Sequence, residues 1–308
     1  LAQSLDMYRC GYYRGYQVSQ LHQVNSNMKI LLYRNVRAIY NYADEWQMAL
    51  DNGWLLRDSS GNLVYNPQYG NVYMVDYGNV EYQKWVANWI KGYLDQYGFD
   101  GVFSDNGFNG VERAYWWDVG GETAQPINPR TGNLWTVDEV IEALCSLHYE
   151  IKRAIGSRLD IANGIFEGAN FWKYQTNWAK LLSNCEVDGF MSEGLFTKWE
   201  PYTYYSEDKW KKSVDFVVWI QNNWLNQQGR IYLPHGRCSS DQIPAGSTPE
   251  QVATYIFSSL LLGIEKSQNY LSLQGAMLLD EIQNLFKTDL GVPKGNYYLI
   301  GEIGRAHV

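Results

Sequence analysis

The sequence predicts a single (β/α)8 barrel, and two observations lead to this prediction. Short apolar segments that end in polar residues alternate with amphipathic helical segments, and about eight such strand–helix pairs can be counted in the 308 residues. No linker or low-complexity tract divides the chain. A doubly wound open sheet is the alternative. The chain has no G-x-G-x-x-G after its first strand and no Walker A motif, which disfavours the nucleotide-binding version of that fold.

The first half of the chain supplies the first strands and one long helix. The segments "DMYRCGYY" (6–13) and "NMKILLYRN" (27–35) are expected strands, and "VYMVDYGN" (72–79) is an extended run that reaches Asp76. A helix is expected over 81–97, because aromatic residues recur there every four positions. Gly98 then ends the helix, and "DGVFSD" follows as a strand.

The second half repeats the alternation after a long loop over 106–135. A helix is expected from Thr136, because Glu139 stands at the spacing of a capping box. Thr248 followed by Pro249 marks another helix start. The remaining predicted elements are strand 158–164, helix 171–182, strand 187–194, helix 206–225, strand 229–236, strand 268–273 and helix 277–286.

Composition narrows the class of partner. The net charge of −8 disfavours non-specific attraction to nucleic acid or to an anionic membrane, and no apolar run approaches the roughly 20 residues of a membrane helix. Aromatic residues make up 16% of the chain, and many of the 25 Tyr and 13 Trp stand beside Asn, Gly or Asp. Rings beside polar groups suit the faces of sugars, although a large core with surface tyrosines would give the same composition. We therefore expect a carbohydrate partner and no cofactor, and the oligomeric state stays open.

The cysteines give little guidance. The four are scattered without a C-x-x-C pair, which argues against a zinc or redox motif. The even number permits disulfides, but the spacing selects no partner. Cys145 and Cys185 lie in apolar-periodic segments, so buried thiols are favoured there. The chain opens at Leu1 without a leader, so any signal peptide is expected to have been removed or never cloned.

Two segments share one pattern that points to a site. "DGVFSDNG" (100–107) and "DGFMSEGL" (188–195) both read Asp-Gly, two apolar residues, Ser, then a carboxylate. Side chains alternate along a strand, so Asp105 shares a face with Phe103. In barrels the active site lies at the carboxyl ends of the strands. The polar residues predicted at the carboxyl ends of the strands are Arg34, Asn35, Asp76, Asp105, Asn106, Asn163, Glu193 and His235.

This set of residue types favours glycoside hydrolysis. The chain has no H-E-x-x-H metal motif and no G-x-S-x-G elbow. What stands out is one carboxylate, Asp105, and a second, Glu193, on two strands separated by one. Glycosidases need a carboxylate that acts at the anomeric carbon and a carboxylic acid that protonates the leaving oxygen. The first must stay ionised and the second must hold a proton near neutral pH.

Each candidate also has a structural interpretation. Asp105 could cap the following segment, and Asp76 could only turn the chain into the next helix. Glu167, on the loop after "RLDIANG", is a competing acid. Arg34 could neutralise an acid or bind substrate, and a lone His235 could be a hydrogen-bonded structural residue. Loop aromatics are candidate sugar-stacking platforms or loop packing: Trp116, Trp117, Trp199 and Tyr202.

Asp100 and Asp188 precede their strands. They are therefore expected at the opposite face of the barrel, where residues serve stability.

The segment "VYMVDYGNVEYQKWVANWIKGYLDQYGFDGVFSDN" closely resembles the hypothetical glycoside-hydrolase-like barrel family, and "KILLYRN" and "NGWLLRDSSGN" are similar to it as well. The resemblance covers most of residues 29–106. More distantly the chain is similar to endo-galactosaminidase and α-galactosidase type barrels, in which acids on strands four and six act as nucleophile and acid/base. Carried over by position, the resemblance implies Asp105 as the nucleophile and Glu193 as the acid/base.

We therefore predict a hydrolase that cleaves an O-glycosidic bond, with retention favoured over inversion. The rivals are a barrel that binds a polysaccharide without cleaving it, and a polysaccharide lyase or deacetylase. Residues 1–290 are assigned to the barrel and 291–308 to a tail. The last residues, 303–308, read "IGRAHV" and match one reading frame of a sequencing-library adapter, so we expect that the natural chain was cut at about Ile300 or Gly301.

Overall fold

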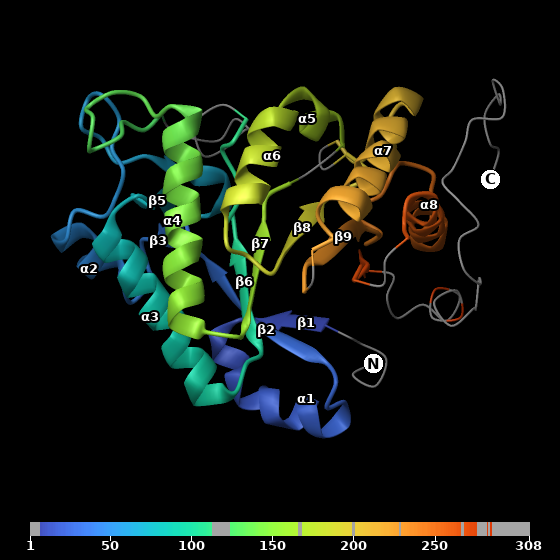
Figure 1. The fold of residues 1–308 in the computed structure, drawn as a ribbon, viewed down its shortest axis with the longest axis horizontal. Helices are drawn as coiled ribbons and strands as arrows, with labels where there is room; N and C mark the ends of the chain where they lie inside the picture. Colours follow the sequence, from blue (N-terminus) through green and yellow to red (C-terminus); the bar gives the residue numbers. More distant parts are fainter. Residues whose placement is uncertain are drawn as a thin grey trace.

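The computed structural model describes residues 7–112, 124–165, 168–198, 201–227, 229–265, 268–275, 282 and 284. Its centre is a parallel sheet that curls as a half-barrel, with the strands in the order β1-β2-β6-β7-β8-β9-β10 (Figure 1). The predicted barrel class is therefore confirmed. The strands are β1 (Met7–Cys10), β2 (Lys29–Asn35), β6 (Gly101–Asp105), β7 (Leu159–Asn163), β8 (Gly189–Glu193), β9 (Ile231–Arg237) and β10 (Ser272–Gln274).

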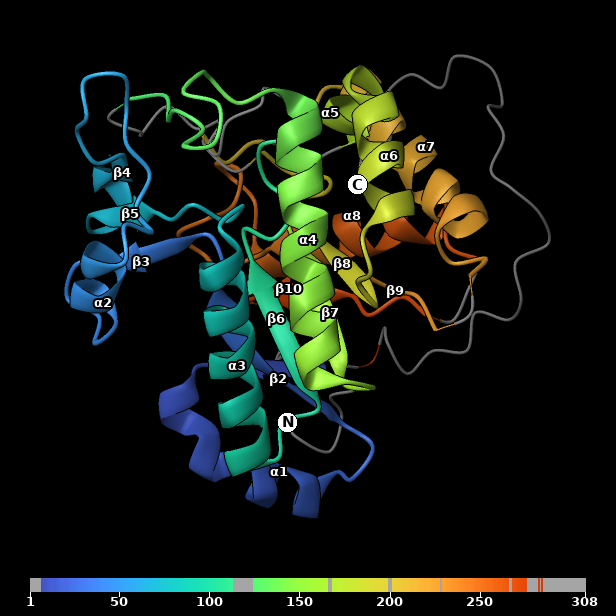
Figure 2. The ribbon, with the colours of Figure 1, turned by 60° about the vertical axis from the view of Figure 1, so that its left-hand side comes forward.

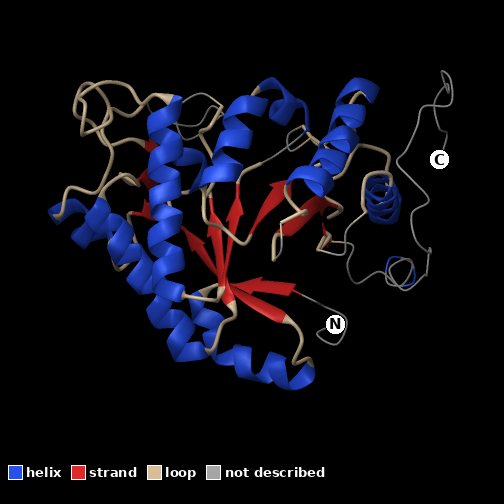
Figure 3. Cartoon of the chain, in the orientation of Figure 1, coloured by secondary structure: helices blue, strands red, loops and turns tan. Residues whose placement is uncertain are grey.

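The two faces of this sheet follow from the alternation of side chains along each strand. Inward-facing residues form a small apolar cluster beneath the strand ends: Leu31, Phe103, Ile161, Met191 and Leu233. Their sequence neighbours, such as Leu32 and Val102, belong to the large core shared with the helices. Figure 3 shows the strands fanning out at the centre with helices around them.

Helices start and end where their capping residues stand. The side chain of Asn79 accepts hydrogen bonds from the backbone of the first turn of α3, which ends at Gly98 with a left-handed φ of 76°. The predicted capping boxes at Thr136 and Thr248 are both present. The helices are α1 (Val18–Val24), α2 (Trp46–Asp51), α3 (Val80–Tyr97), α4 (Val137–Ile155), α5 (Gly168–Lys173), α6 (Gln175–Asn184), α7 (Glu207–Asn223) and α8 (Pro249–Leu261), with 3-10 helices η2 (Tyr12–Gln17) and η3 (Pro67–Tyr69).

The structure corrects two predicted elements. The helix predicted over 171–182 is two helices, α5 and α6, broken at Tyr174. The extended run 72–79 does not join the barrel. It contributes β5 (Val72–Met74) to a separate antiparallel sheet with β3 (Ala38–Tyr40) and β4 (Tyr65–Asn66). Figure 2 shows this sheet and α2 set to one side of the barrel strands.

The separate sheet changes the count of barrel strands. Asp105 and Glu193 lie on the third and fifth strands of the described parallel sheet, not on the fourth and sixth. The spacing of one intervening strand is kept, because β7 lies between β6 and β8.

The expectation of two buried thiols at Cys145 and Cys185 is wrong. Cys145 on α4 and Cys185 at the end of α6 form a disulfide, with their Cα atoms 4.4 Å apart. Their spacing does not predict the pair, because 40 positions separate them and only helix packing brings them together. Cys10 and Cys238 are buried free thiols. Within the described ranges, no helix has the length and apolarity to cross a membrane.

Candidate active site

Five side chains meet at the carboxyl ends of the barrel strands, and we call them the tip cluster. They are Tyr33 on β2, Asp105 on β6, Asn163 on β7, Glu193 on β8 and Arg237 on β9. Parallel pairing brings the strand ends to one edge: Asn35 pairs with Asp105, and Asn163 pairs with Met191. Polar residues that end neighbouring strands on the same face are therefore placed together.

Asn163 connects the two predicted acids. Its side-chain nitrogen Nδ2 donates to Asp105 Oδ1 at 2.9 Å and to Glu193 Oε2 at 3.2 Å. Because one nitrogen contacts both, the two acceptor oxygens are at most 6.1 Å apart, the sum of these two distances. The structure thus brings Asp105, Asn163 and Glu193 together.

The second carboxylate oxygen of Asp105 has its own donor. The Tyr33 hydroxyl donates to Asp105 Oδ2 at 2.5 Å. Burial, and next the negative charge of Asp105, raise the pKa of Tyr33 well above its ordinary value, so the hydroxyl keeps its proton. Although 37% of Tyr33 is exposed, its hydroxyl is engaged in the cluster. Each carboxylate oxygen of Asp105 therefore accepts a hydrogen bond from its own donor.

The surroundings of Glu193 raise the pKa of its carboxyl group. Its side chain is only 14% exposed, and burial, followed by the charge of Asp105, raises the pKa of its carboxyl. The hydrogen bond from Asn163 and the charges of Arg9 and Arg237 act against this shift without cancelling it. Arg237 Nη2 lies 3.5 Å from Glu193 Oε1. The environment therefore favours a protonated Glu193 beside Asp105.

His235 lies next to the cluster in a neutral state. It pairs with Glu193 in the register of β8 and β9, and it is 4% exposed. Its Nδ1 lies 3.0 Å from Ser272 Oγ. Burial, and then the charges of Arg9 and Arg237, lower the pKa of His235 to about 3. A histidine that stays neutral at neutral pH can serve as a hydrogen-bonding group but not as a cationic acid.

Asn106 shapes the chain directly after Asp105. It adopts a left-handed φ of 57°, a conformation that Asn tolerates better than most residues. Its Oδ1 accepts a hydrogen bond of 2.6 Å from Nδ2 of Asn109. This turn ends the strand and directs the following loop away from it.

Arg34 points to the other face of β2. Its guanidinium donates to Glu45 Oε1 at 2.6 Å and lies 4.4 Å from the ring centre of Trp89. Among the described contacts, none joins Arg34 to the tip cluster. Alternation places it on the helix side, where it pairs with an acid, one of the two roles expected for it.

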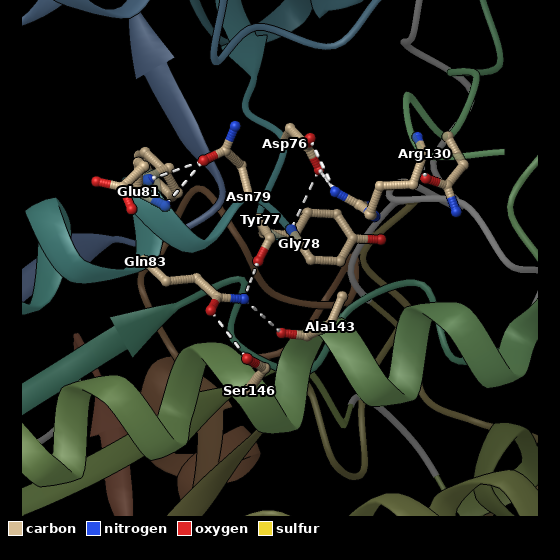
Figure 4. A network of polar contacts seen from close by, with 11 residues as sticks. Asp76, Tyr77, Gly78, Asn79, Glu81, Gln83, Arg130, Ala143 and Ser146 are labelled. Atoms are coloured by element: carbon tan, nitrogen blue, oxygen red, sulfur yellow. Dashed lines mark hydrogen bonds and ion pairs between the residues drawn. The ribbon is translucent and has the colours of Figure 1, made fainter. Parts of the chain in front are cut away.

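Asp76 belongs to a network at the start of α3 (Figure 4). Both of its carboxylate oxygens accept from Arg130 Nη1 at 3.0 Å, and the backbone of Gly78 also donates to it. Burial raises the pKa of Asp76, and Arg130 opposes that shift. The neighbouring Gln83 bonds the Tyr77 carbonyl and Ser146, so the network fastens α3 to α4. Among its described contacts, none joins Asp76 to the tip cluster, and β5, which precedes it, belongs to the separate sheet.

The loop that follows β8 reaches the cluster through Tyr202. This half-buried tyrosine forms a side-chain hydrogen bond with Arg237. Two neighbours fix the loop, since Tyr205 donates to the Gly194 carbonyl at 2.8 Å and the Tyr204 hydroxyl lies 3.0 Å from Ser247 Oγ. Other predicted site residues lie outside the described residues: Trp116, Trp117, Glu167 and Trp199.

The acids that precede the two patterned strands act as structural residues, as predicted. Asp100 Oδ2 accepts from the backbone of Ile30 at 2.8 Å, and Asp188 Oδ2 accepts from the backbone of Asp160 at 2.7 Å. Each acid thus ties the start of its strand to a neighbouring strand. Asp188 also accepts from Lys152 at 2.7 Å.

A buried Ser, Asp and His set lies behind the cluster. Ser104 Oγ donates to Asp160 Oδ1 at 2.7 Å, and His148 Nδ1 lies 2.7 Å from Asp160 Oδ2. All three are fully buried, and the carboxylate lies between the hydroxyl and the imidazole. This order cannot activate the serine as a nucleophile. His148 Nε2 lies 3.2 Å from the Gly107 carbonyl, so the set supports the turn after Asp105.

Sequence reasoning missed three charged or polar residues of this region: Tyr33, Arg9 and Arg237. Tyr33 stands two positions after Leu31, and Arg237 stands two after His235, so the period of a strand places each on the inner face. Arg9 follows Met7 in the same way on β1. The alternation of side chains along each strand is therefore the signal that locates all three residues. In the described part of the chain, no group of three or more His, Cys, Asp or Glu is arranged to hold a metal ion.

Residues 22–306 match the protein family described as Hypothetical glycosyl hydrolase family 15. Among solved structures, the chain is similar to the glycoside hydrolase domain of PelA from Pseudomonas aeruginosa, with a TM-score of 0.56, 13% identity and 90% of each chain covered. It is also similar to Amy13B of Eubacterium rectale, with a TM-score of 0.50, 12% identity, and 84% and 50% of the two chains covered. A third similar structure is Ega3 of Aspergillus fumigatus in complex with galactosamine, with a TM-score of 0.49, 10% identity, and 88% and 84% covered.

No curated protein matches the chain. At these identities the similar structures bear on the fold alone.

Proposed function

Because the chain belongs to the hypothetical glycosyl hydrolase family 15, we propose that it hydrolyses an O-glycosidic bond of a poly- or oligosaccharide with Asp105 as the nucleophile and Glu193 as the acid/base. The observation that supports this proposal is the shared donor Asn163, which holds the two carboxyl groups side by side in different environments. This chemistry requires one carboxyl group that stays ionised and a second that holds a proton.

The proposed reaction has two steps. In the first, a carboxylate oxygen of Asp105 attacks the anomeric carbon, the glycosidic C–O bond breaks, and the leaving oxygen takes the proton from Glu193. In the second, Glu193 takes a proton from water while the water oxygen attacks the anomeric carbon, the sugar leaves, and Asp105 returns as a carboxylate. Glu193 ends the cycle protonated, as it began.

The distance between the acids favours retention of configuration. Retaining glycosidases hold their carboxyl groups about 5–5.5 Å apart, and inverting ones about 6.5–9.5 Å. The upper bound of 6.1 Å on the oxygens that share Asn163 lies below the inverting range.

The experiment is a digestion screen over polysaccharides with the wild type, Asp105→Asn and Glu193→Gln. Each variant is expected to lose about 10³-fold or more in turnover on a cleaved polymer, with circular dichroism unchanged, because each removes a reacting group. Matched controls are Asp208→Asn and Glu81→Gln, whose side chains are 72% and 76% exposed. A polymer cleaved equally well by both site variants would overturn the assignment.

The screen also separates the rival functions. Tight binding of a polysaccharide without any cleavage would support a non-catalytic binding barrel. Release of an unsaturated sugar would indicate a lyase, and release of acetate would indicate a deacetylase. The first-formed anomer, followed by proton NMR, distinguishes retention from inversion.

A further inference from the structure

The carboxylate oxygens of the tip cluster all have donors within the cluster. Asn163 serves Asp105 Oδ1 and Glu193 Oε2, and Tyr33 serves Asp105 Oδ2. Arg237 lies 3.5 Å from Glu193 Oε1. Each of the four carboxylate oxygens therefore already has one donor inside the cluster.

A second guanidinium, that of Arg9, lies on the same inner face of the sheet, over the ring of Phe103. Its Cζ is 4.6 Å from the ring centre of Phe103 and 5.9 Å from that of Tyr33. Phe103 is two positions before Asp105 on the same face of β6, so Arg9 lies on the inner side of the curled sheet. The side chain is exposed, and among the residues that the structure describes it makes no ion pair.

The charge of Arg9 acts on the cluster across the curl of the sheet. Its charge opposes the rise in the pKa of Glu193 and adds to the fall in the pKa of His235, although β1 is not adjacent to β8 or β9 in the described sheet. His235 is neutral and adds no charge of its own. In a chain whose net charge is −8, this side of the strand ends carries two arginines. An exposed guanidinium with free donors at such a position is suited to receive an anion.

We propose that Arg9 binds an anionic substituent of the substrate, so that the substrate is an acidic polysaccharide. This inference rests on the proposed function, because it names the substrate class of the same site. The planar fork of an arginine matches a carboxylate with two parallel hydrogen bonds, which favours uronic acid residues. A sulfate ester has the same charge and would be bound by the same donors. Phe103, beneath the guanidinium, holds it by a cation–π contact and keeps its donors directed at the substrate.

The test compares each acidic polymer with its own neutral form. Affinity electrophoresis is run with polygalacturonate, alginate and hyaluronan, and with the same polymers after chemical reduction of their carboxylates to alcohols. Chondroitin sulfate and its desulfated form separate sulfate from carboxylate as the anion bound. The salt concentration is held at about 0.15 M, where surface charges are screened.

We expect at least one acidic polymer to bind the wild type about tenfold or more tightly than its neutral form, as for hydrogen bonds to charged groups. Arg9→Gln should bring the two forms to equal affinity, whereas Arg9→Lys should keep part of the difference, because the charge remains and the fork is lost. The matched control is Arg14→Gln, an exposed arginine on η2 beside Tyr13. Arg14→Gln should leave the affinity for the acidic polymer and the affinity for its neutral form unchanged.

The outcomes are distinct for the two proposals. The proposal of an acidic substrate is overturned if the neutral forms bind as tightly as the acidic forms or more tightly. It is also overturned if Arg9→Gln lowers the affinity for both forms equally. Cleavage of a neutral polymer that depends on Asp105 and Glu193 overturns it as well, and leaves the hydrolase proposal standing. Selective binding of an acidic polymer without hydrolysis, or with an unsaturated product, supports the acidic substrate and overturns the hydrolase.

Discussion

Asp105 and Glu193 share one hydrogen-bond donor: the side-chain nitrogen of Asn163 lies 2.9 Å from Asp105 Oδ1 and 3.2 Å from Glu193 Oε2. A donor between two carboxyl groups stabilises negative charge on both and fixes their separation. Burial and the charge of Asp105 still raise the pKa of Glu193, and the hydrogen bond from Asn163 opposes that rise without cancelling it.

Replacing Asn163 with alanine should therefore change both the rate and its pH dependence. Without the donor, the pKa of Glu193 rises further, because the bond from Asn163 lowers it in the wild type. If Glu193 is the general acid, the basic limb of the kcat/KM profile moves to higher pH, and kcat falls by about 10²-fold because the two carboxyls lose their fixed geometry. The measurement is a pH–rate profile on a cleaved polysaccharide.

Asn52→Ala is the matched control, because Asn52 is exposed and bonds only the Met48 carbonyl among the described contacts. It should leave the profile unchanged. A basic limb that stays in place in Asn163→Ala would show that Glu193 does not supply the proton in the rate-limiting step.

The raised pKa of Glu193 also predicts how stability depends on pH. Between its ordinary value of 4.5 and the higher value in the fold, the native state binds more protons than the unfolded state. The free energy of unfolding of the wild type then falls as pH rises through that window. In Glu193→Gln this group no longer titrates, so the variant should gain stability relative to the wild type from pH 4 to pH 8.

Denaturant titrations at several pH values measure this difference. Below about pH 4 the two proteins should show a constant difference, because Glu193 is protonated in both states. Glu81→Gln, at an exposed position, serves as the control. If the gain in the free energy of unfolding of Glu193→Gln over the wild type became smaller as pH rises, the fold would stabilise the charged form of Glu193.

The ring of Tyr202 should contribute to binding of extended substrates. It lies beside Arg237 at the edge of the tip cluster, on a loop fastened at Gly194 and Ser247. Tyr202→Ala should raise KM for an oligosaccharide by about tenfold, the loss of one stacked ring, and spare kcat on a small activated glycoside. Tyr202→Phe keeps the ring and loses the hydroxyl, so it should retain most of the affinity. Equal effects of Ala and Phe would indicate that the contact with Arg237, not the ring, carries the binding.

Much of the barrel could be predicted because its signals are local. Capping residues such as Thr136 and Thr248 mark helix starts, and the repeated Asp-Gly pattern marks the strands that carry Asp105 and Glu193. The environment of these acids could not be predicted in the same way, because Tyr33 and Arg9 reach them from strands distant in sequence. Only the register of the sheet and its curl bring those strands together.

The assignment of Asp76 to the barrel failed for a related reason. The extended segment 72–79, which contains Asp76, is as apolar as a barrel strand. Its strand β5, however, pairs with the antiparallel strands β3 and β4. The turn at Asp58, whose carboxylate accepts from the backbone of Ser60 and Asn62, closes a hairpin in which Arg57 pairs with Leu63, and it is a local signal of antiparallel structure in this part of the chain.

The disulfide between Cys145 and Cys185 should account for a measurable part of the stability. A cross-link closing a loop of this length, with a sequence separation of 40, restricts the unfolded chain and is worth about 4 kcal/mol in the chain-entropy estimate. The double variant Cys145→Ala, Cys185→Ala should lose up to that amount in denaturant unfolding. Dithiothreitol should destabilise the wild type and leave the double variant unaffected.

Thiol titration of the unfolded, unreduced wild type should find the free thiols of Cys10 and Cys238 and no others. The control variant Cys238→Ala removes a buried thiol outside the bond, so its stability should remain sensitive to dithiothreitol. Four titratable thiols, together with a wild type indifferent to reductant, would show that the two cysteines are close but unbonded in solution.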